Sequence, residues 1–318
     1  MEILKELGLE DKARYFGEEI PRVPEEKYTM IVLLRETKSH CVFTTEIDVL
    51  NVARVEAGKE NSEMIDRVVM FKRKQVAPER RSGKRLLREY EFMKLEDCYL
   101  MDNVCCECPD CLLYGGIRAE TSQKARIYYD NAYTIREYDR VHERLTLTAI
   151  DEKTGRPGAA FTDVDHLKPN VVLPCVVTLH NVTPGEFAYV LLNIMRTKRY
   201  GAEVTRIGSV ENHIVGLIFS TAECISNLDL TQALYDRLVK EKGKPLKELA
   251  YNDVEKHIDE VIKQLIAKKP VKADVVTKNE TEKVVSKFIE NYKNEENVKG
   301  LLENLMTQAK AYVKKYQR

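Results

Sequence analysis

The spacing of hydrophobic side chains divides this chain of 318 residues into two parts. Up to about residue 220, short runs rich in β-branched and aromatic residues are separated by turn-forming residues, a pattern typical of strands. After Ser226, hydrophobic positions recur every three or four residues, as they do along one face of an amphipathic helix. The first part is therefore predicted to contain strands at residues 29–34, 68–71, 126–135, 144–150, 171–180 and 213–220.

The second part is predicted to be helical. In residues 254–265, and again in residues 298–316, apolar side chains repeat with the spacing i, i+3, i+4 and i+7. Pro270 separates these stretches, because proline cannot continue a helix. The simplest interpretation is a helical module, residues 226–318, that packs on the first part. The alternative is a helical surface that docks a partner.

A further helical stripe lies between the last two predicted strands, in residues 185–198. The order of strand, helix, basic turn with glycine and strand is that of a β-α-β unit. A mixed sheet with helices on one face, the ferredoxin-like or RNA-recognition arrangement, accounts for this order better than a doubly wound sheet does. We therefore predict an α+β fold. The glycine spacing matches neither a dinucleotide fingerprint nor a phosphate-binding loop.

Composition indicates a folded protein outside the membrane. Hydrophobic residues make up 43% of the chain, and no apolar run approaches the roughly 18 to 20 residues that span a bilayer. The first twenty residues carry acids where a signal peptide has a basic and then an apolar stretch, so we expect a cytoplasmic location. Charged residues reach 32% and tryptophan is absent, a composition consistent with a thermophilic source.

Net charge at first argues against a nucleic-acid partner, because 51 Lys and Arg balance 51 Asp and Glu. The charges are unevenly spread, however. Residues 67–88 hold one acid, Glu79, and nine basic residues: Arg67, Lys72, Arg73, Lys74, Arg80, Arg81, Lys84, Arg85 and Arg88. Pro78, Ser82 and Gly83 predict a mobile loop between two strands. Such a run is often only a solvated surface, but its density favours contact with phosphates.

Two further basic clusters are candidates for the same role. One follows the helical stripe and contains Arg196, Lys198, Arg199 and Arg206, near glycines whose backbone can approach phosphates closely. A plain connection with solvated ends explains that cluster equally well. The other contains Lys124 and Arg126, which precede Tyr128 in a predicted strand. Tyrosines in strands more often pack in a core than stack on bases.

Five of the eight cysteines lie between Cys98 and Cys111. Without an export signal, metal binding explains them better than disulfides do. A structural zinc site uses four ligands, often with two residues between consecutive cysteines. The predicted zinc ligands are Cys98, Cys105, Cys108 and Cys111. Cys106 could replace Cys105, and His142 or another imidazole could supply the fourth ligand. Buried thiols without metal, or a redox pair, are the alternatives.

A catalytic zinc is less favoured than a structural one. Zinc deaminases require a His-x-Glu motif and many metalloproteases require His-Glu-x-x-His, and the chain contains neither. The remaining cysteines lie in apolar runs and are predicted to be small core residues: Cys41, Cys175 and Cys224.

Several short segments, in this order, resemble one known family. They are CPDCLLYG at residues 108–115, SQKARI at residues 122–127, DNA at residues 130–132 and TGRPGAAF at residues 154–161. They are similar to the backbone subunit of type I-D CRISPR interference complexes, a member of the repeat-associated RNA-binding superfamily. The likeness continues more weakly through residues 171–220.

The resemblance implies a modified RNA-recognition core with additions. Members of the family polymerise along a guide RNA, hold its backbone and leave its bases free to pair with target nucleic acid. The implied partners are guide RNA, further copies of this chain and other CRISPR subunits. The implied organisation is a core at 1–225, a basic lid at 60–90, a zinc-binding insertion at 91–118, a thumb hairpin at 143–170 and a helical domain at 226–318.

A guide-binding subunit must accept any guide sequence, so phosphate contacts should dominate its interface. The residues predicted to contact RNA are Lys72, Arg73, Lys74, Arg80, Arg81, Lys84, Arg85, Lys124, Arg126, Arg156, Arg196, Lys198, Arg199 and Arg206.

Three functions are compatible with these features. The leading hypothesis is a scaffold without enzymatic activity that binds guide RNA. The main rival is a nuclease subunit, because related proteins cut target with a loop aspartate, for which Asp48 is the candidate. A lone aspartate in a turn is more often a cap or an ion-pair partner. The third hypothesis is a zinc-stabilised adaptor that binds only protein.

Overall fold

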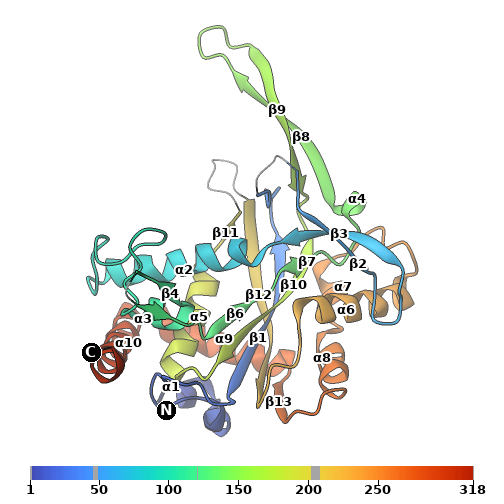
Figure 1. Cartoon of the computed structure of the whole chain (residues 1–318). Coiled ribbons are helices and arrows are strands. Elements are labelled where there is room, and N and C mark those ends of the chain that lie inside the picture. Colours follow the sequence, from blue (N-terminus) through green and yellow to red (C-terminus); the bar gives the residue numbers. More distant parts are fainter. Residues whose placement is uncertain (1, 46–48, 120, 202–207, 318) are drawn as a thin grey trace.

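The computed structural model describes residues 2–45, 49–119, 121–201 and 208–317. Within these residues the centre is a six-stranded sheet (Figure 1). Four of its strands are antiparallel neighbours in the order β12 (Gly208–Ser220), β1 (Tyr28–Thr37), β10 (Val172–His180) and β6 (Ile127–Tyr129). The short strands β11 (Arg199–Tyr200) and β13 (Ala273–Val276) pair with β12. These antiparallel sheets, combined with helices, confirm the predicted α+β class.

Strand β1 is buried on both faces, which explains its nearly continuous apolar run. Ile31 and Leu33 join one core cluster, while Met30 and Val32 join another on the opposite face. The first cluster includes side chains of α2 (Lys72–Glu89) and α5 (Pro184–Arg196). The second includes side chains of α6 (Asn227–Lys242), α7 (Tyr251–Glu255) and α8 (Ile258–Ile266).

The C-terminal helices share these two cores. Helices α6 to α8 cover one face of the sheet, and α9 (Lys278–Tyr292) and α10 (Glu295–Tyr316) contribute Phe288 and Leu302 to the cluster on the other. Residues 226–318 therefore pack on both faces of the same sheet. The helix predicted at residues 254–265 is divided into α7 and α8, whereas the one predicted at 298–316 lies within α10.

Each predicted strand segment overlaps a strand of the structure. Residues 126–135 are divided between β6 and β7 (Ala132–Tyr133), and residues 68–71 overlap β3 (Met64–Met70), which pairs with β2 (Val52–Glu56) and β7. The smaller elements are α1 (Glu2–Leu7), η1 (Glu10–Tyr15), α3 (Pro109–Tyr114), β4 (Gly116–Ile117), β5 (Ser122–Gln123) and α4 (Tyr138–Val141). Among the described helices, none is long and apolar enough to cross a membrane.

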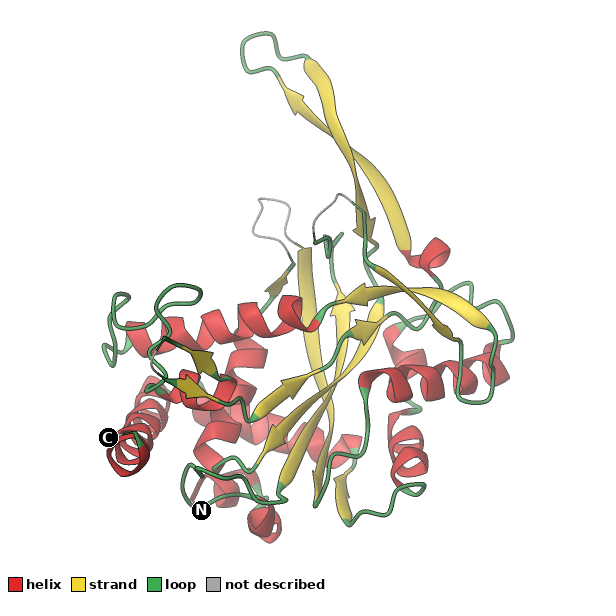
Figure 2. Cartoon of the chain, in the orientation of Figure 1, coloured by secondary structure: helices red, strands yellow, loops and turns green. Residues whose placement is uncertain are grey.

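A two-stranded hairpin extends away from the body of the molecule (Figure 2). Its strands, β8 (His142–Ile150) and β9 (Pro157–Leu167), are antiparallel and occupy the region predicted to form a hairpin at 143–170. At its base, Leu167 forms a bridge with Cys41, and Glu143 lies 3.0 Å from His40. The hairpin is therefore anchored to the loop that follows β1.

The prediction of a mobile loop at residues 67–88 is wrong. Residues 72–89 form α2, a helix of 18 residues, although Pro78 lies inside it. Gly83 marks a close helix contact instead of a loop, because a Cβ atom there would lie 2.2 Å from the Tyr189 hydroxyl of α5. Arg67 precedes the helix on β3, where its buried guanidinium donates to the backbone carbonyl oxygens of Ala57, Thr134 and Ile135.

Glu79, the one acid in this basic segment, faces the interior. It lies 2.7 Å from Arg35 of β1, and both side chains are fully buried. The hydroxyls of Tyr129 and Tyr200 donate hydrogen bonds to its carboxylate at 2.5 and 2.8 Å. These contacts fix α2 to strands β1, β6 and β11. The carboxylate is thus neutralised inside the protein and does not offset the cations on the outer face of α2.

Candidate metal centre and basic groove

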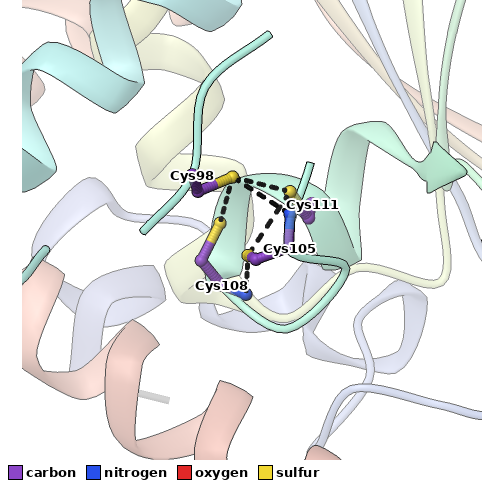
Figure 3. Close-up of side chains that lie close together, drawn as sticks. All are labelled: Cys98, Cys105, Cys108 and Cys111. Atoms are coloured by element: carbon purple, nitrogen blue, oxygen red, sulfur yellow. Dashed lines mark hydrogen bonds between the residues drawn. The ribbon is translucent and has the colours of Figure 1, made fainter. Parts of the chain in front are cut away.

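The four predicted zinc ligands lie together in the structure. The Sγ atoms of Cys98, Cys105, Cys108 and Cys111 are all within 4.8 Å of one another (Figure 3). The Sγ of Cys98 lies 3.4 Å from that of Cys111 and 3.9 Å from that of Cys108, and Cys105 lies 3.8 Å from Cys111. A tetrahedral Zn²⁺ with bonds of about 2.3 Å places its sulfur ligands roughly 3.8 Å apart. The donor set therefore fits zinc.

Local backbone geometry presents these thiols on one side of a tight turn. The backbone N–H groups of Glu107 and Cys108 lie 3.4 and 3.3 Å from the Cys105 Sγ atom, where they donate to it. Cys108 is the N-cap of α3, and Pro109 begins the helix, so Cys111 follows one turn later on the same side. The sequence Cys-x-x-Cys-x-x-Cys is thus folded into a turn and the first turn of a helix.

Neither alternative ligand belongs to this cluster. Cys106 has a φ of 61°, and its Sγ atom faces the carbonyl oxygens of Val104 and Thr121. His142 lies at the base of the hairpin, where its ring stacks on that of Tyr138 with 4.0 Å between the ring centroids. Cys41, Cys175 and Cys224 are buried elsewhere, which confirms their assignment to the core. Burial raises the pKa of Cys175 to about 11, as expected for a thiol in an apolar interior.

Two of the predicted RNA-binding residues lie against the cysteines. The ammonium of Lys84 is 2.8 Å from the Cys98 Sγ atom and 3.1 Å from the Asp110 carboxylate. Arg80, one turn earlier on α2, lies 2.7 Å from the same carboxylate and 3.6 Å from the Cys111 Sγ atom. Lys84 is buried and Arg80 nearly so. Both charged groups are engaged by Asp110 and the cysteines, so we remove both residues from the candidate RNA surface.

Lys84 nevertheless stays charged. Burial alone would lower its pKa, but the interactions with the Asp110 carboxylate and with the Cys108 and Cys111 side chains outweigh burial and raise the pKa of Lys84. The same balance, with burial opposed mainly by Asp110, raises the pKa of Arg80. Both side chains are therefore cations beside the cysteine cluster.

Arg126 is also unsuited to RNA contact. Its guanidinium is buried, lies 2.9 Å from Glu186 and donates a second hydrogen bond to the same carboxylate. Glu186 itself caps α5 through a reciprocal pair of hydrogen bonds with Thr183. The ion pair fixes the residue just before β6 to the start of α5. We therefore remove Arg126 from the candidate RNA surface as well.

Two of the basic clusters meet in a groove. Arg85 of α2 lines it from one side, and the other side is lined by Arg196, Lys198 and Arg199, at the end of α5 and on β11. The groove has a volume of about 430 Å³, and Ser82 and Thr197 are among its lining residues. Glu89 is the one carboxylate among the described lining residues, and it lies 3.8 Å from Arg196.

Further cations lie on the outer face of α2, beyond the groove. Lys74, Arg81 and Arg85 are spaced by seven and four residues, which places them on one side of the helix. Burial, together with the nearby charges of Arg73 and Arg81, lowers the pKa of Lys74, as expected where cations are crowded. Lys72 and Arg73 are exposed at the start of the same helix. The face therefore extends the positive charge along the helix.

The other predicted contact residues lie elsewhere. Lys124 is exposed next to β5, and Arg156 is exposed in the turn between β8 and β9. Arg206 and Asp48 lie outside the described residues. That the α2 and β11 clusters form one groove is not evident from the sequence. The only available signal was the helical spacing of Lys74, Arg81 and Arg85.

A second group of metal-ligating side chains is present among the described residues: Glu36, Glu211 and His213. The Lys38 ammonium lies 2.7 Å from Glu36 and 3.4 Å from Glu211. These two carboxylates therefore share a cation of the chain itself, and the group forms an ion-pair cluster between β1 and β12.

Comparison with known proteins finds a matching family and similar solved structures. The family model described as Csc2 Crispr matches residues 15–302. The crystal structure of Thermofilum pendens Csc2 is similar, with a TM-score of 0.62 and 18% identity, over 99% of this chain and 98% of that one. This likeness shows a shared fold. No curated protein matches the chain significantly.

Two weaker structural similarities accompany it. A chain of a Type IV-B CRISPR complex has a TM-score of 0.42 and 13% identity over 58% of this chain and 89% of that one. A chain of a CRISPR RNA-guided surveillance complex has a TM-score of 0.46 and 11% identity over 88% and 99%. The match that covers residues 15–302 shows that this chain belongs to the Csc2 CRISPR family.

Proposed function

We propose that this chain binds single-stranded guide RNA, independently of guide sequence, as the repeated backbone subunit of a type I-D CRISPR interference complex. The observation that carries the proposal is the basic groove between α2 and β11. Its guanidinium and ammonium groups come from Arg85, Arg196, Lys198 and Arg199. Such groups bind phosphate oxygens regardless of the attached base, as a subunit that accepts any guide requires.

The arrangement of the central sheet supports an RNA-recognition core. Along the chain the order is β1, α2, β6, β10, α5 and β12, whereas across the sheet the strand order is β12, β1, β10, β6. If these strands are numbered one to four along the chain, their spatial order is 4-1-3-2. We propose that this is the ferredoxin-like core. In this account α2 replaces the basic lid and the β8–β9 hairpin is the thumb.

We further propose that copies of the chain associate head to tail along the RNA. An isolated two-stranded hairpin is only marginally stable in water, so the projecting β8–β9 hairpin is suited to contact another molecule. An open hollow of about 1570 Å³ beside α1, α5 and α10 offers a second surface. Acids outnumber bases two to one in its lining, which contains six carboxylates, from Glu2, Glu6, Glu18, Glu19, Glu25 and Glu296, and three cations, from Arg14, Arg22 and Lys27. Such a surface complements a basic face of a neighbour.

The proposed role is structural. Zinc bound by Cys98, Cys105, Cys108 and Cys111 would cross-link the loop after α2 to α3 and would not take part in chemistry. The proposed nuclease residue, Asp48, lies outside the described residues, and no observation on the described residues favours that alternative.

The proposal predicts RNA binding that is steeply dependent on salt and nearly independent of sequence. Each phosphate contact to a single strand releases about 0.7 counterion, so four contacts predict roughly a 50-fold loss of affinity between about 50 and 200 mM salt. Fluorescence anisotropy with two unrelated single-stranded RNAs of equal length measures both properties. A protein-only adaptor would show no salt-dependent RNA affinity, and a large preference for one RNA would contradict sequence-independent binding.

A further inference from the structure

We propose that Lys84 and Arg80 are charge-compensating residues of the metal centre, and that they link it to the RNA-binding face of α2. The first half of this inference depends only on a metal bound by the four cysteines. The second half rests on the proposed function. No motif suggested this role, because both residues belong to a basic run that is equally compatible with RNA contact.

The contacts of Lys84 reach three of the four clustered cysteines. Its ammonium lies 2.8 Å from the Cys98 Sγ atom, 3.7 Å from that of Cys111 and 3.9 Å from that of Cys108. The side chain is only 2% exposed, so almost no water reaches it. A buried ammonium is costly unless it is paired, and here its partners are three thiols and one carboxylate. The position of Lys84 is explained if these sulfurs carry negative charge.

These two cations offset most of the negative charge of the proposed centre, reducing it from minus three to minus one. Zn²⁺ with four thiolates has a net charge of minus two, and the buried Asp110 adds a third negative charge. Arg80 lies 2.7 Å from Asp110 and neutralises that carboxylate. Lys84 then supplies the positive charge nearest to the thiolates. Backbone N–H groups, such as that of Cys105 at 3.4 Å from the Cys98 Sγ atom, provide the remaining polar contacts.

Helix α2 therefore has a separate role on each of three sides. Glu79, Leu86 and Leu87 face the core, and Arg80 and Lys84 face the cysteines. Lys74, Arg81 and Arg85 lie on the outer face and in the groove. Because these residues share one helix, we expect the loss of the contacts to the metal centre to change the position of the groove residues as well. Metal binding and RNA binding would be coupled through α2.

The test compares three variants of the full chain, purified with zinc: Lys84→Met, Arg80→Met and Arg85→Met. Each removes one cation from the same helix, but Arg85 faces the groove and serves as the matched control. Loss of a residue that supports metal ligands typically weakens metal binding by about 10- to 100-fold. We expect zinc release to a colorimetric chelator to accelerate by that factor in K84M, to accelerate less in R80M and to stay unchanged in R85M.

Equal release rates in K84M, R80M and R85M would overturn the inference. If K84M does not fold, R80M carries the same test, because the Arg80 side chain is 14% exposed and Asp110 keeps its ion pair with Lys84 when Arg80 is replaced. RNA affinity is then measured for the same proteins. We expect K84M to bind RNA more weakly than wild type although Lys84 lies outside the groove, and unchanged affinity would contradict the coupling. Wild-type protein that binds no RNA would contradict the proposed function alone, since zinc release is measured without RNA.

Discussion

Replacing Cys108 with serine is expected to abolish tight metal binding and to lower the free energy of unfolding by about 4 kcal/mol or more, the range seen when a structural metal is lost. Cys108 contributes one of four clustered thiols and joins the turn after Cys105 to helix α3. Serine is a favourable N-cap, so the substitution does not weaken the start of α3. The loss of stability would therefore come from the metal. Metal content by mass spectrometry and unfolding in denaturant measure the two effects.

Cys106→Ser is the matched control for this experiment. Cys106 is buried only two residues away, yet its Sγ atom faces backbone carbonyls and lies outside the cluster. We expect this variant to keep one zinc ion per chain and most of its stability. An unchanged zinc content in Cys108→Ser, or equal losses in the two variants, would contradict the assigned ligand set.

Neutralising the groove is expected to weaken RNA binding by roughly 10²- to 10³-fold at about 0.1 M salt. The variant changes four residues to glutamine: Arg85, Arg196, Lys198 and Arg199. Each lost phosphate contact is worth about fivefold at this salt concentration, because it no longer releases about 0.7 counterion. The loss should be similar for unrelated RNAs, and the slope of log affinity against log salt should fall by about 3.

A second quadruple variant controls for total charge. It replaces four exposed lysines on α9 and α10 that do not line the groove: Lys283, Lys287, Lys310 and Lys314. The net charge changes by the same amount, so a general electrostatic effect would weaken both variants equally. We expect the control to bind RNA within about twofold of wild type at 0.1 M salt, where charges more than about 10 Å apart are screened. Equal losses of RNA affinity in both variants would contradict the assignment of the groove as the RNA-binding site.

Patterns that depend on local spacing were predictable from the sequence. The alternation of apolar runs and turns located β1, β10 and β12, because each is long and largely buried. Two-residue spacing located three of the four clustered cysteines, and Cys98 follows from the requirement for four ligands. The hairpin of β8 and β9 followed from the family resemblance.

Features decided by tertiary contacts were not predictable in this way. Pro78 and Gly83 favour a loop when read locally, but the buried pair of Glu79 with Arg35 and the close packing on Tyr189 hold residues 72–89 as a helix. Which of its cations are buried depends on partners far away in sequence. Lys84 and Arg85 are adjacent, yet one faces the cysteines and the other lines the groove.

Because some of the basic residues are buried, the number of basic residues in the sequence does not by itself measure the RNA-binding surface. The chain has zero net charge, and its basic segment is not uniformly an RNA surface. Three of the predicted contact residues, Arg80, Lys84 and Arg126, are used inside the protein. The predicted contact residues that line the groove come from segments more than a hundred residues apart in the sequence.

We propose that this chain binds the backbone of guide RNA, whatever the guide sequence. This proposal is tested most directly by purifying the chain from cells that express one of two guides with unrelated sequences and by characterising the nucleic acid that copurifies. We expect RNA of guide length in both preparations, with several copies of the chain on each RNA. Protein that copurifies without RNA, or with only one of the two guides, would contradict the proposal.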